Sequence, residues 1–357
     1  IRLSLVGSEM CIRDRSMIGW YVHHHGWGHM TRMQAIRPHL GDEVTVFSSL
    51  PEPASLPPET LWVQLPSDSD AVVGPDGVSR EAHELGDVTA RGTLHWAPLG
   101  HPGHQARLAA IAEWVAIHPT SAFVVDVSVE VTILARLLGV PTISVAQPGD
   151  RTDAPHRLGY DLADRILAPW APGTIPAKAL IGREDRVRSV GAISRYDGRA
   201  CTEADADADA DDVRRVLFLG LALDPVRLAQ TRELLSADGW VVENAGAGSD
   251  DRIDDVWPLL CRATVVVSAA GQNSIADLAA ADARAVVIAQ ERPFDEQKEM
   301  ARVLAAHGLA RTVAADASPA EVVDSIRRAA DTAPRWDVWQ VSGSAARAAA
   351  AIEELAR

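Results

Sequence analysis

The sequence predicts an α/β protein with two Rossmann-like domains, each built on a parallel sheet, that face a central cleft. In both halves of the chain, short apolar runs alternate with amphipathic stretches, which is the pattern of βα units. Between the halves lies EADADADADD, residues 203–212, whose repelling charges cannot join a core. We therefore expect domains at residues 17–200 and 214–357, joined by an acidic linker at residues 201–213.

The first domain is expected to contain six strands, because six short apolar runs are separated by turn residues or helical stretches. In order, the runs are IGWYVHH, EVTVFSS, LWVQL, AFVVDV, PTISVA and RILAP. Helical spacing of apolar residues predicts helices over residues 30–40, 105–116 and 129–138.

The second domain repeats the alternation. Its expected strands are RRVLFLG, GWVVENA, ATVVVSA and AVVIAQ. Its expected helices cover residues 225–237, 274–281 and 296–306, and an Ala-rich helix ends the chain. In such sheets ligands bind outside the carboxyl ends of the strands, so the loops that follow the strands are the candidate sites.

Composition excludes several classes of protein. The chain has 357 residues, of which 47% are apolar, and this is enough for two ordinary cores. No apolar run approaches the length of a membrane span. The net charge of −15 argues against unspecific nucleic-acid binding, which needs clustered Lys and Arg. We expect a cytoplasmic protein with no nucleic-acid partner.

The first sixteen residues are expected to be foreign to the fold. The stretch LVGSEMCIRDR, residues 5–15, matches an in-frame reading of a transposon-end adapter used for sequencing libraries. We therefore treat residues 1–16 as an artefact and Met17 as the expected start. Outside this leader only Cys201 and Cys261 remain. They lack metal-ligand spacing, so we expect reduced thiols.

The stretch HHHGWGHMTR, which follows the first strand, raises a choice between a metal site and a substrate loop. In an extended strand His23 and His25 would lie on one face and His24 on the other, so the three would not converge on one ion. Gly26 and Gly28 allow a tight turn and close approach of a ligand. His29, at the cleft end of the strand, is the chemical candidate. An Asp-x-Asp metal motif at Asp68 and Asp70 or within the linker is the weaker alternative.

Asp126 ends the apolar strand FVVDV and should face the same cleft. A carboxylate there can hold one imidazole nitrogen and stabilise the imidazolium that forms. The alternative is that Asp126 caps the helix that begins near Val129. Both roles are compatible with the sequence.

The stretch SAAGQNSIADLAAADARAVVIAQERPFDEQ, residues 268–297, has the pattern of an anion site. A strand runs into Gly271, and a helix follows with Asn273 or Ser274 as its expected N-cap. Free N–H groups and the helix dipole favour a phosphate there. Asp277, one turn into the helix, could accept from ribose hydroxyls.

These motifs resemble those of GT-B-fold glycosyltransferases, most closely family 28, which includes the enzyme that adds N-acetylglucosamine to lipid-linked peptidoglycan precursors. Gly26-Trp27-Gly28-His29 resembles the family's Gly-x-Gly-His loop. In the related family 1 the histidine of this loop is a general base held by an aspartate, and His29 and Asp126 fit those places. The resemblance also implies that the last helix crosses back to the first domain, with Trp336 and Trp339 as anchors.

The resemblance implies an inverting transferase that uses a nucleotide sugar, expected to be UDP-linked, and no cofactor or metal. The implied donor-binding residues are Gly220, Gly271, Gln272, Asn273, Ser274, Asp277, Arg292, Phe294, Glu296 and Gln297. On the acceptor side we expect Gly26, Trp27, Gly28, Arg151 and His156. Arg151 and His156 could meet an anionic group, and one of Trp27, Trp96 and Trp114 could stack on the acceptor. The acceptor is expected to be a small molecule, a lipid-linked compound or a glycan, with peripheral membrane contact an open possibility.

Three departures from the family pattern keep two further functions open. Ala269 stands where relatives often have a histidine, Asp277 replaces a glutamate, and the loop at Gly220 lacks the usual paired glycines. A nucleotide-sugar epimerase of the same fold would turn over the donor without an acceptor. A degenerate GT-B subunit would bind a partner without catalysis.

Overall fold

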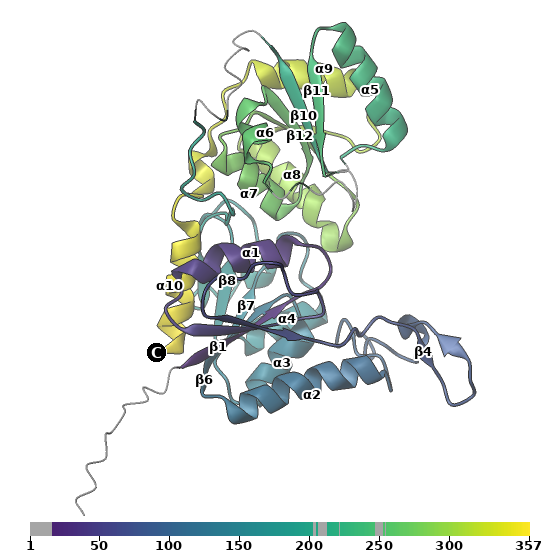
Figure 1. Cartoon of the computed structure of the whole chain (residues 1–357), viewed down its shortest axis with the longest axis vertical. Coiled ribbons are helices and arrows are strands. Elements are labelled where there is room, and N and C mark those ends of the chain that lie inside the picture. The colour runs from purple at the N-terminus through teal and green to yellow at the C-terminus, as the bar shows by residue number, and fades with distance from the viewer. Residues whose placement is uncertain (1–15, 203–204, 206–212, 221, 247–252, 254) are drawn as a thin grey trace, which may run out of the picture.

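The computed structural model describes residues 16–202, 205, 213–220, 222–246, 253 and 255–357. The leader and most of the Ala-Asp segment lie outside the described residues. Two lobes are stacked along the long axis of the molecule, the N-terminal one below and the C-terminal one above in Figure 1. Each lobe is built on one parallel sheet, as the sequence predicts.

The first sheet has seven strands in the order β3-β2-β1-β6-β7-β8-β9, and all its pairs are parallel. Its strands are β1 (Met17–Val22), β2 (Glu43–Ser48), β3 (Thr60–Gln64), β6 (Thr120–Asp126), β7 (Thr142–Val145), β8 (Arg165–Ala168) and β9 (Val187–Ser189). Its helices are α1 (Gly28–Ile36), α2 (Pro102–Ile117), α3 (Val129–Leu137) and α4 (Ala154–Leu162). Short 3-10 turns are η1 (Arg37–His39), η2 (Ala82–Glu84) and η3 (Lys178–Leu180), and β4 (Val72–Val73) pairs with β5 (Ser79–Arg80) in a hairpin.

Side chains of β1 alternate between two cores, one on each face of the sheet. Ile18 and Trp20 join the core under α1, whereas Tyr21 joins the core under α2 and α3. Gly19 lies on the second face, where a Cβ would come within 2.4 Å of the Phe123 ring. Only glycine fits there, so this position is set by packing between neighbouring strands.

The second sheet has five parallel strands in the order β11-β10-β12-β13-β14. Its strands are β10 (Arg215–Leu219), β11 (Val241–Ala245), β12 (Val265–Ala269), β13 (Ala285–Ile288) and β14 (Arg311–Val313). Its helices are α5 (Pro225–Ala237), α6 (Trp257–Arg262), α7 (Gln272–Ala280), α8 (Glu296–Ala306) and α9 (Pro319–Ala330), with 3-10 turns η4 (Pro293–Asp295) and η5 (Trp336–Trp339).

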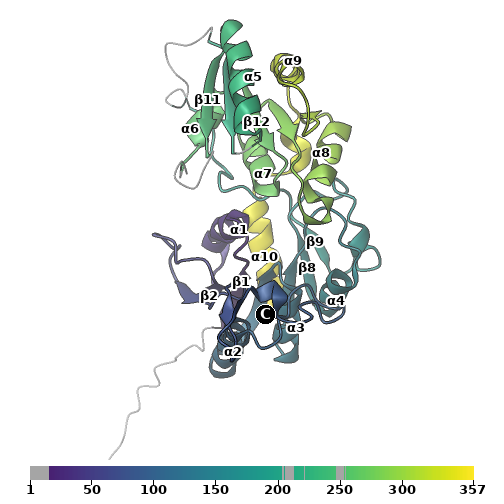
Figure 2. The ribbon, with the colours of Figure 1, turned by 90° about the vertical axis from the view of Figure 1, so that its right-hand side faces the viewer.

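The last helix, α10 (Ser344–Ala356), returns to the first lobe, which confirms the predicted crossing (Figures 1 and 2). Its alanines and Ile352 pack into the core under α1. Two tryptophans join the lobes at the crossing. Trp336 Nε1 donates to Ala283 O at 2.9 Å in the second lobe, and the Trp339 carbonyl accepts from Ala192 N at 3.1 Å in the first.

Cys201 and Cys261 form a disulfide, so the expectation of two reduced thiols is wrong. The bond ties the segment that follows the first lobe to α6 of the second. Sequence spacing carries no sign of this pair, because the two residues are 60 positions apart and meet only in the tertiary fold. None of the described helices is long and apolar enough to cross a membrane.

Candidate active site

His29 and Asp126 meet at the carboxyl edge of the first sheet. β1 and β6 are parallel neighbours with Val22 opposite Asp126, so both chains leave the sheet at the same edge. His29 Nδ1 lies 2.9 Å from Asp126 Oδ1, and Asp126 is fully buried. Burial alone would raise the pKa of Asp126, but Arg32 and His29 hold it below its usual value. Asp126 is therefore an ionised acceptor for the imidazole.

The structure also tests whether Asp126 is the N-cap of α3. The cap of α3 is Ser128, whose Oγ accepts from Val131 N at 3.1 Å. Asp126 is thus not the cap, and its carboxylate serves the histidine instead.

Arg32 is a member of this site that sequence reasoning missed. It is buried in α1, where Nη1 donates to Asp126 Oδ1 at 3.0 Å and Nη2 donates to Gln272 Oε1 at 3.1 Å. The position of Arg32 in the sequence could have indicated this role, because a residue three positions after His29 lies on the same face of the helix.

The three histidines before the glycine loop do not continue the strand. β1 ends at Val22, and His23, His24 and His25 form a turn in which neighbouring ring centroids are 4.4 to 4.9 Å apart. The expectation that they point to opposite strand faces is therefore wrong. Gly26, with φ of +85°, makes the turn that brings α1 to its start.

The start of α7 lies directly against the glycine loop. Gly271 is its N-cap and makes no side-chain capping bond, so the predicted caps Asn273 and Ser274 are instead inside the helix. Asn273 Nδ2 donates to Gly28 O at 2.6 Å. Gln272 accepts from Arg32 and donates through Nε2 to Pro169 O at 3.1 Å. The uncapped N–H groups of α7 thus lie beside the His29 loop.

Asp277 does not present a free carboxylate to a ligand. It is buried, Ser194 Oγ donates to Oδ1 at 2.6 Å, and Arg195 Nε donates to Oδ2 at 3.2 Å. Burial raises its pKa. Both oxygens already accept bonds from the segment that joins the lobes, which favours a structural role for Asp277 over the expected ribose contact.

The loop after β13 is held by the first lobe and by its own helix. Gln297 is buried, and its amide oxygen accepts from Ala270 N at 3.2 Å and from Gln290 N at 2.8 Å. That oxygen therefore fixes two loops, which favours a structural role for it over the predicted contact with the sugar. Glu296 Oε2 accepts from Arg151 Nη2 at 3.0 Å. Arg292 is exposed at the start of η4.

The C-terminal part of the chain matches a known family. Residues 252–354 match the glycosyltransferase family 28 C-terminal domain. We call residues 252–354 the family 28 domain, after the family that they match. It contains α7, the loop after β13 and most of α10, so the predicted donor motif lies within it.

Solved structures extend the likeness over the whole chain. Acinetobacter baumannii MurG has a TM-score of 0.61 at 13% identity, with 95% of this chain and 99% of that one covered. The calicheamicin glycosyltransferase CalG4 has a TM-score of 0.59 at 15% identity, with coverage of 96% and 95%. The spinosyn rhamnosyltransferase SpnG, solved with thymidine diphosphate, has a TM-score of 0.59 at 17% identity, with coverage of 95% of each chain. No match was found among curated protein sequences.

The predicted GT-B fold is therefore confirmed. The family 28 domain and the fold together support a glycosyltransferase enzyme, which is the class that the sequence predicts.

Arg151 contacts the family 28 domain. It is buried, and its guanidinium lies 4.4 Å from the centre of the Phe294 ring and bonds to Glu296. These contacts favour a role between the lobes over the expected place on the acceptor side. Trp27 remains exposed and Trp114 is buried in the core under α2.

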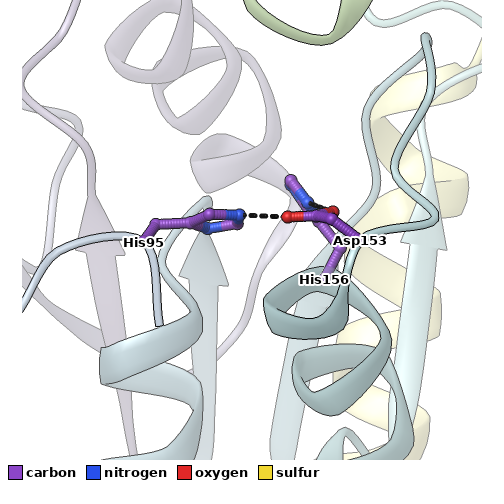
Figure 3. Close-up of side chains that lie close together, drawn as sticks. All are labelled: His95, Asp153 and His156. Carbon is purple, nitrogen blue, oxygen red and sulfur yellow. Dashed lines mark hydrogen bonds and ion pairs between the residues drawn. The ribbon is translucent and has the colours of Figure 1, made fainter. Parts of the chain in front are cut away.

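His156 belongs to a His-Asp-His group that Figure 3 shows. His95 Nε2 lies 2.7 Å from one oxygen of Asp153, and His156 Nδ1 bonds to the other. Among the described residues this is the one group with metal-ligand spacing. Arg151 Nη1 lies 3.4 Å from His156 Nε2. Arginine can only donate, so Nε2 of His156 is the acceptor of that bond. Nδ1 then carries the ring proton and donates a hydrogen bond to Asp153.

In this tautomer Nδ1 of His156 donates to Asp153, and a metal could bind Nδ1 only if it displaced that proton. Burial lowers the pKa of His156 to about 4, against the opposing effect of Asp153, so the ring is neutral. The geometry is thus that of a hydrogen-bonded group, which joins the loop at His95 to the start of α4. Asp68 and Asp70 also form no pair, since Asp68 is buried against Arg107 and Asp70 is exposed.

Proposed function

We propose that this chain transfers a sugar from a nucleotide-sugar donor to an acceptor hydroxyl, with inversion at the anomeric carbon. The observation that carries the proposal is the contact between the His29 loop and the start of α7. Asn273 Nδ2 donates to Gly28 O, so the loop of the proposed base, His29, lies next to the helix start that we propose as the anion site. A displacement reaction needs those two groups on opposite sides of the reacting carbon.

His29 is the proposed base. Because Asp126 is ionised, it accepts a hydrogen bond from the Nδ1–H of His29, and the lone pair of Nε2 is then free for the proton of the acceptor hydroxyl. Nε2 takes the hydroxyl proton while the hydroxyl oxygen forms a bond to the anomeric carbon. Asp126 stabilises the imidazolium that results. A single attack from the face opposite the leaving group inverts that carbon.

The leaving group is a nucleoside diphosphate, which keeps the electron pair of the broken carbon–oxygen bond. The uncapped N–H groups of residues 271–274 and the dipole of α7 stabilise its charge. Such groups can carry the charge without a divalent ion, and Ala269 is then no obstacle. Uridine diphosphate is the expected carrier, and thymidine diphosphate, with which SpnG was solved, is the second candidate.

The test is release of nucleoside diphosphate from UDP- and dTDP-sugars, measured with and without a mixture of hydroxylated acceptors. Transfer requires acceptor-dependent release that is lost in His29→Ala and kept in His39→Ala, a matched control on the exposed end of η1. Isomerised donor without acceptor would instead identify an epimerase. Tight nucleotide binding with no turnover under any condition would identify a binding subunit.

A further inference from the structure

A cavity of about 350 Å³ opens between the histidine turn, α2 and α3. His23 is part of its wall, and the ring centroids of His23 and His29 are 5.9 Å apart. A molecule in the cavity would thus end beside the proposed base. The volume is in the range of sites for small organic ligands, of roughly 300–1,000 Å³.

One wall of the cavity is a fixed aromatic surface. Trp96 Nε1 donates to Asp68 O at 3.0 Å, and Trp96 N donates to Glu130 Oε1 at 3.0 Å. The neighbouring His95 is tied to Asp153 of the His-Asp-His group (Figure 3). Leu108 and Val131 add apolar surface. A flat, rigid wall of this kind suits a ring compound, because stacking needs little loss of side-chain freedom.

The polar end of the cavity is a buried ion pair. Arg107 is 2% exposed, pairs with Asp68 and donates through Nη2 to Tyr21 Oη at 2.8 Å. Although burial opposes it, Arg107 holds the pKa of Asp68 below its usual value, and burial lowers the pKa of His24. At neutral pH Asp68 and Arg107 carry opposite charges and His24 is neutral, so this end has no excess charge.

Several polar atoms of this end have no hydrogen-bond partner among the described residues. They are Asp68 Oδ1, both ring nitrogens of His24, His104 Nδ1 and Arg107 Nη1, of which the last forms an ion pair with the other oxygen of Asp68. His24 Nε2 and His104 Nδ1 each lie 3.9 Å from an oxygen of Asp68, which is too far for a hydrogen bond. Buried polar groups are normally paired. Asp68 Oδ1 needs a donor, whereas the neutral His24 ring offers one donor and one acceptor, so these atoms indicate a ligand with hydroxyl groups, which can both donate and accept.

We propose that the acceptor is a compact, uncharged, hydroxylated ring compound that binds in this cavity. One of its hydroxyls donates to Asp68, its ring lies against Trp96, and a second hydroxyl reaches His29 past His23. The proposal rests on the proposed transfer reaction and specifies its acceptor. It disfavours a lipid-linked diphosphate, because the one buried guanidinium of the cavity is already neutralised by Asp68.

The test is calorimetric titration of the full chain with three probes at pH 7. Resveratrol is uncharged and carries hydroxyls at both ends of a flat skeleton. Its trimethyl ether keeps the shape but has no donor, and farnesyl diphosphate represents the anionic lipid. Resveratrol should bind at one site per chain, at least tenfold more tightly than either other probe. Tighter binding of farnesyl diphosphate would overturn the proposal.

Variants place the binding in the cavity. Asp68→Asn should weaken resveratrol at least tenfold, and Asp70→Asn, on the same loop but exposed, should leave it unchanged. Leu108→Trp places a larger side chain of α2 in the cavity. It should also weaken resveratrol binding, and it replaces Asp68→Asn as the test if that variant fails to fold. Resveratrol affinity unchanged in both folded cavity variants would refute the site. UDP and dTDP titrated into the same preparations separate the two ideas: if neither nucleotide binds, the transferase proposal fails, whereas nucleotide binding without resveratrol binding defeats only this inference.

Discussion

Arg32→Gln tests whether the base pair and the donor helix form one unit. The guanidinium is the one group that bonds to both Asp126 and Gln272, and Asp126 is fully buried. Removing one partner of a buried charge pair typically costs about 3–5 kcal/mol. The total free energy of unfolding of a folded domain is about 5–15 kcal/mol. We therefore expect a large but measurable loss of stability in urea.

The pH dependence gives the variant a signature that a packing defect lacks. In the native chain the pKa of Asp126 is lowered, so its contribution to stability is present above the unfolded pKa of about 4 and is lost as pH falls through the folded value. Without Arg32, only His29 opposes burial, and we expect the pKa of Asp126 to rise above its unfolded value. The carboxyl then favours folding only when protonated, so the variant should gain stability as pH falls from 7 towards 4. The acid limb of kcat/KM should move to higher pH for the same reason.

Two further variants complete this test. Arg32→Lys keeps the charge but cannot bond to Asp126 and Gln272 in one fork, so it should restore stability better than activity. Arg136→Gln removes an arginine whose side chain is 49% exposed and should cost at most about 1 kcal/mol. An Arg32→Gln protein with native stability and an unmoved pH profile would refute the reasoning.

Four other changes have definite expected outcomes. His29→Ala and Asp126→Ala should each lower turnover by about 10²–10⁴-fold with nucleotide affinity kept, and the double mutant should lose much less than the product, as measured on folded protein. EDTA should leave turnover unchanged, since the start of α7 carries the leaving charge; activity restored only by magnesium or manganese would contradict this. Asp277→Asn should lower the melting temperature and leave UDP affinity within about threefold, because its partners are Ser194 and Arg195; a loss of about tenfold or more would return Asp277 to the ribose site. Reduction of the Cys201–Cys261 disulfide should destabilise the chain by about 2–4 kcal/mol, read from urea curves with and without dithiothreitol.

Elements with strong local patterns could be predicted from the sequence. The helix expected over residues 225–237 is α5, and the one expected over 296–306 is α8. The elements that were not predicted include α9, although it begins with a capping box of Ser318 and Glu321, and several weakly patterned elements. β9 and β14 have three residues each, and α4 contains Pro155 and Gly159, which are poor signals of a helix.

The site residues also differ in how well the sequence predicts them. The pairing of His29 with Asp126 could be predicted, because both follow parallel strands that end at the same edge of one sheet. The roles of Arg32, Arg151 and Asp277 depend on how one lobe meets the other. No local pattern encodes that contact, so residues that a motif assigns to a ligand can instead hold the lobes together.

The loop after β13 shows how far this dependence extends. Phe294 and Asp295 have φ of +62° and +52°, and neither is glycine. Such residues cost about 1–3 kcal/mol each and persist only where their surroundings hold them. Here the surroundings belong to the first lobe: Asp150 N donates to Phe294 O at 2.8 Å, and Arg151 covers the ring and bonds to Glu296. The backbone of the first lobe also comes close to this loop at Gly149, where a Cβ would lie 2.3 Å from Phe294 O. The loop that the family resemblance assigns to the donor sugar thus takes its shape from both lobes, so substitutions at Gly149 or Arg151 should alter donor use although neither residue belongs to the family 28 domain.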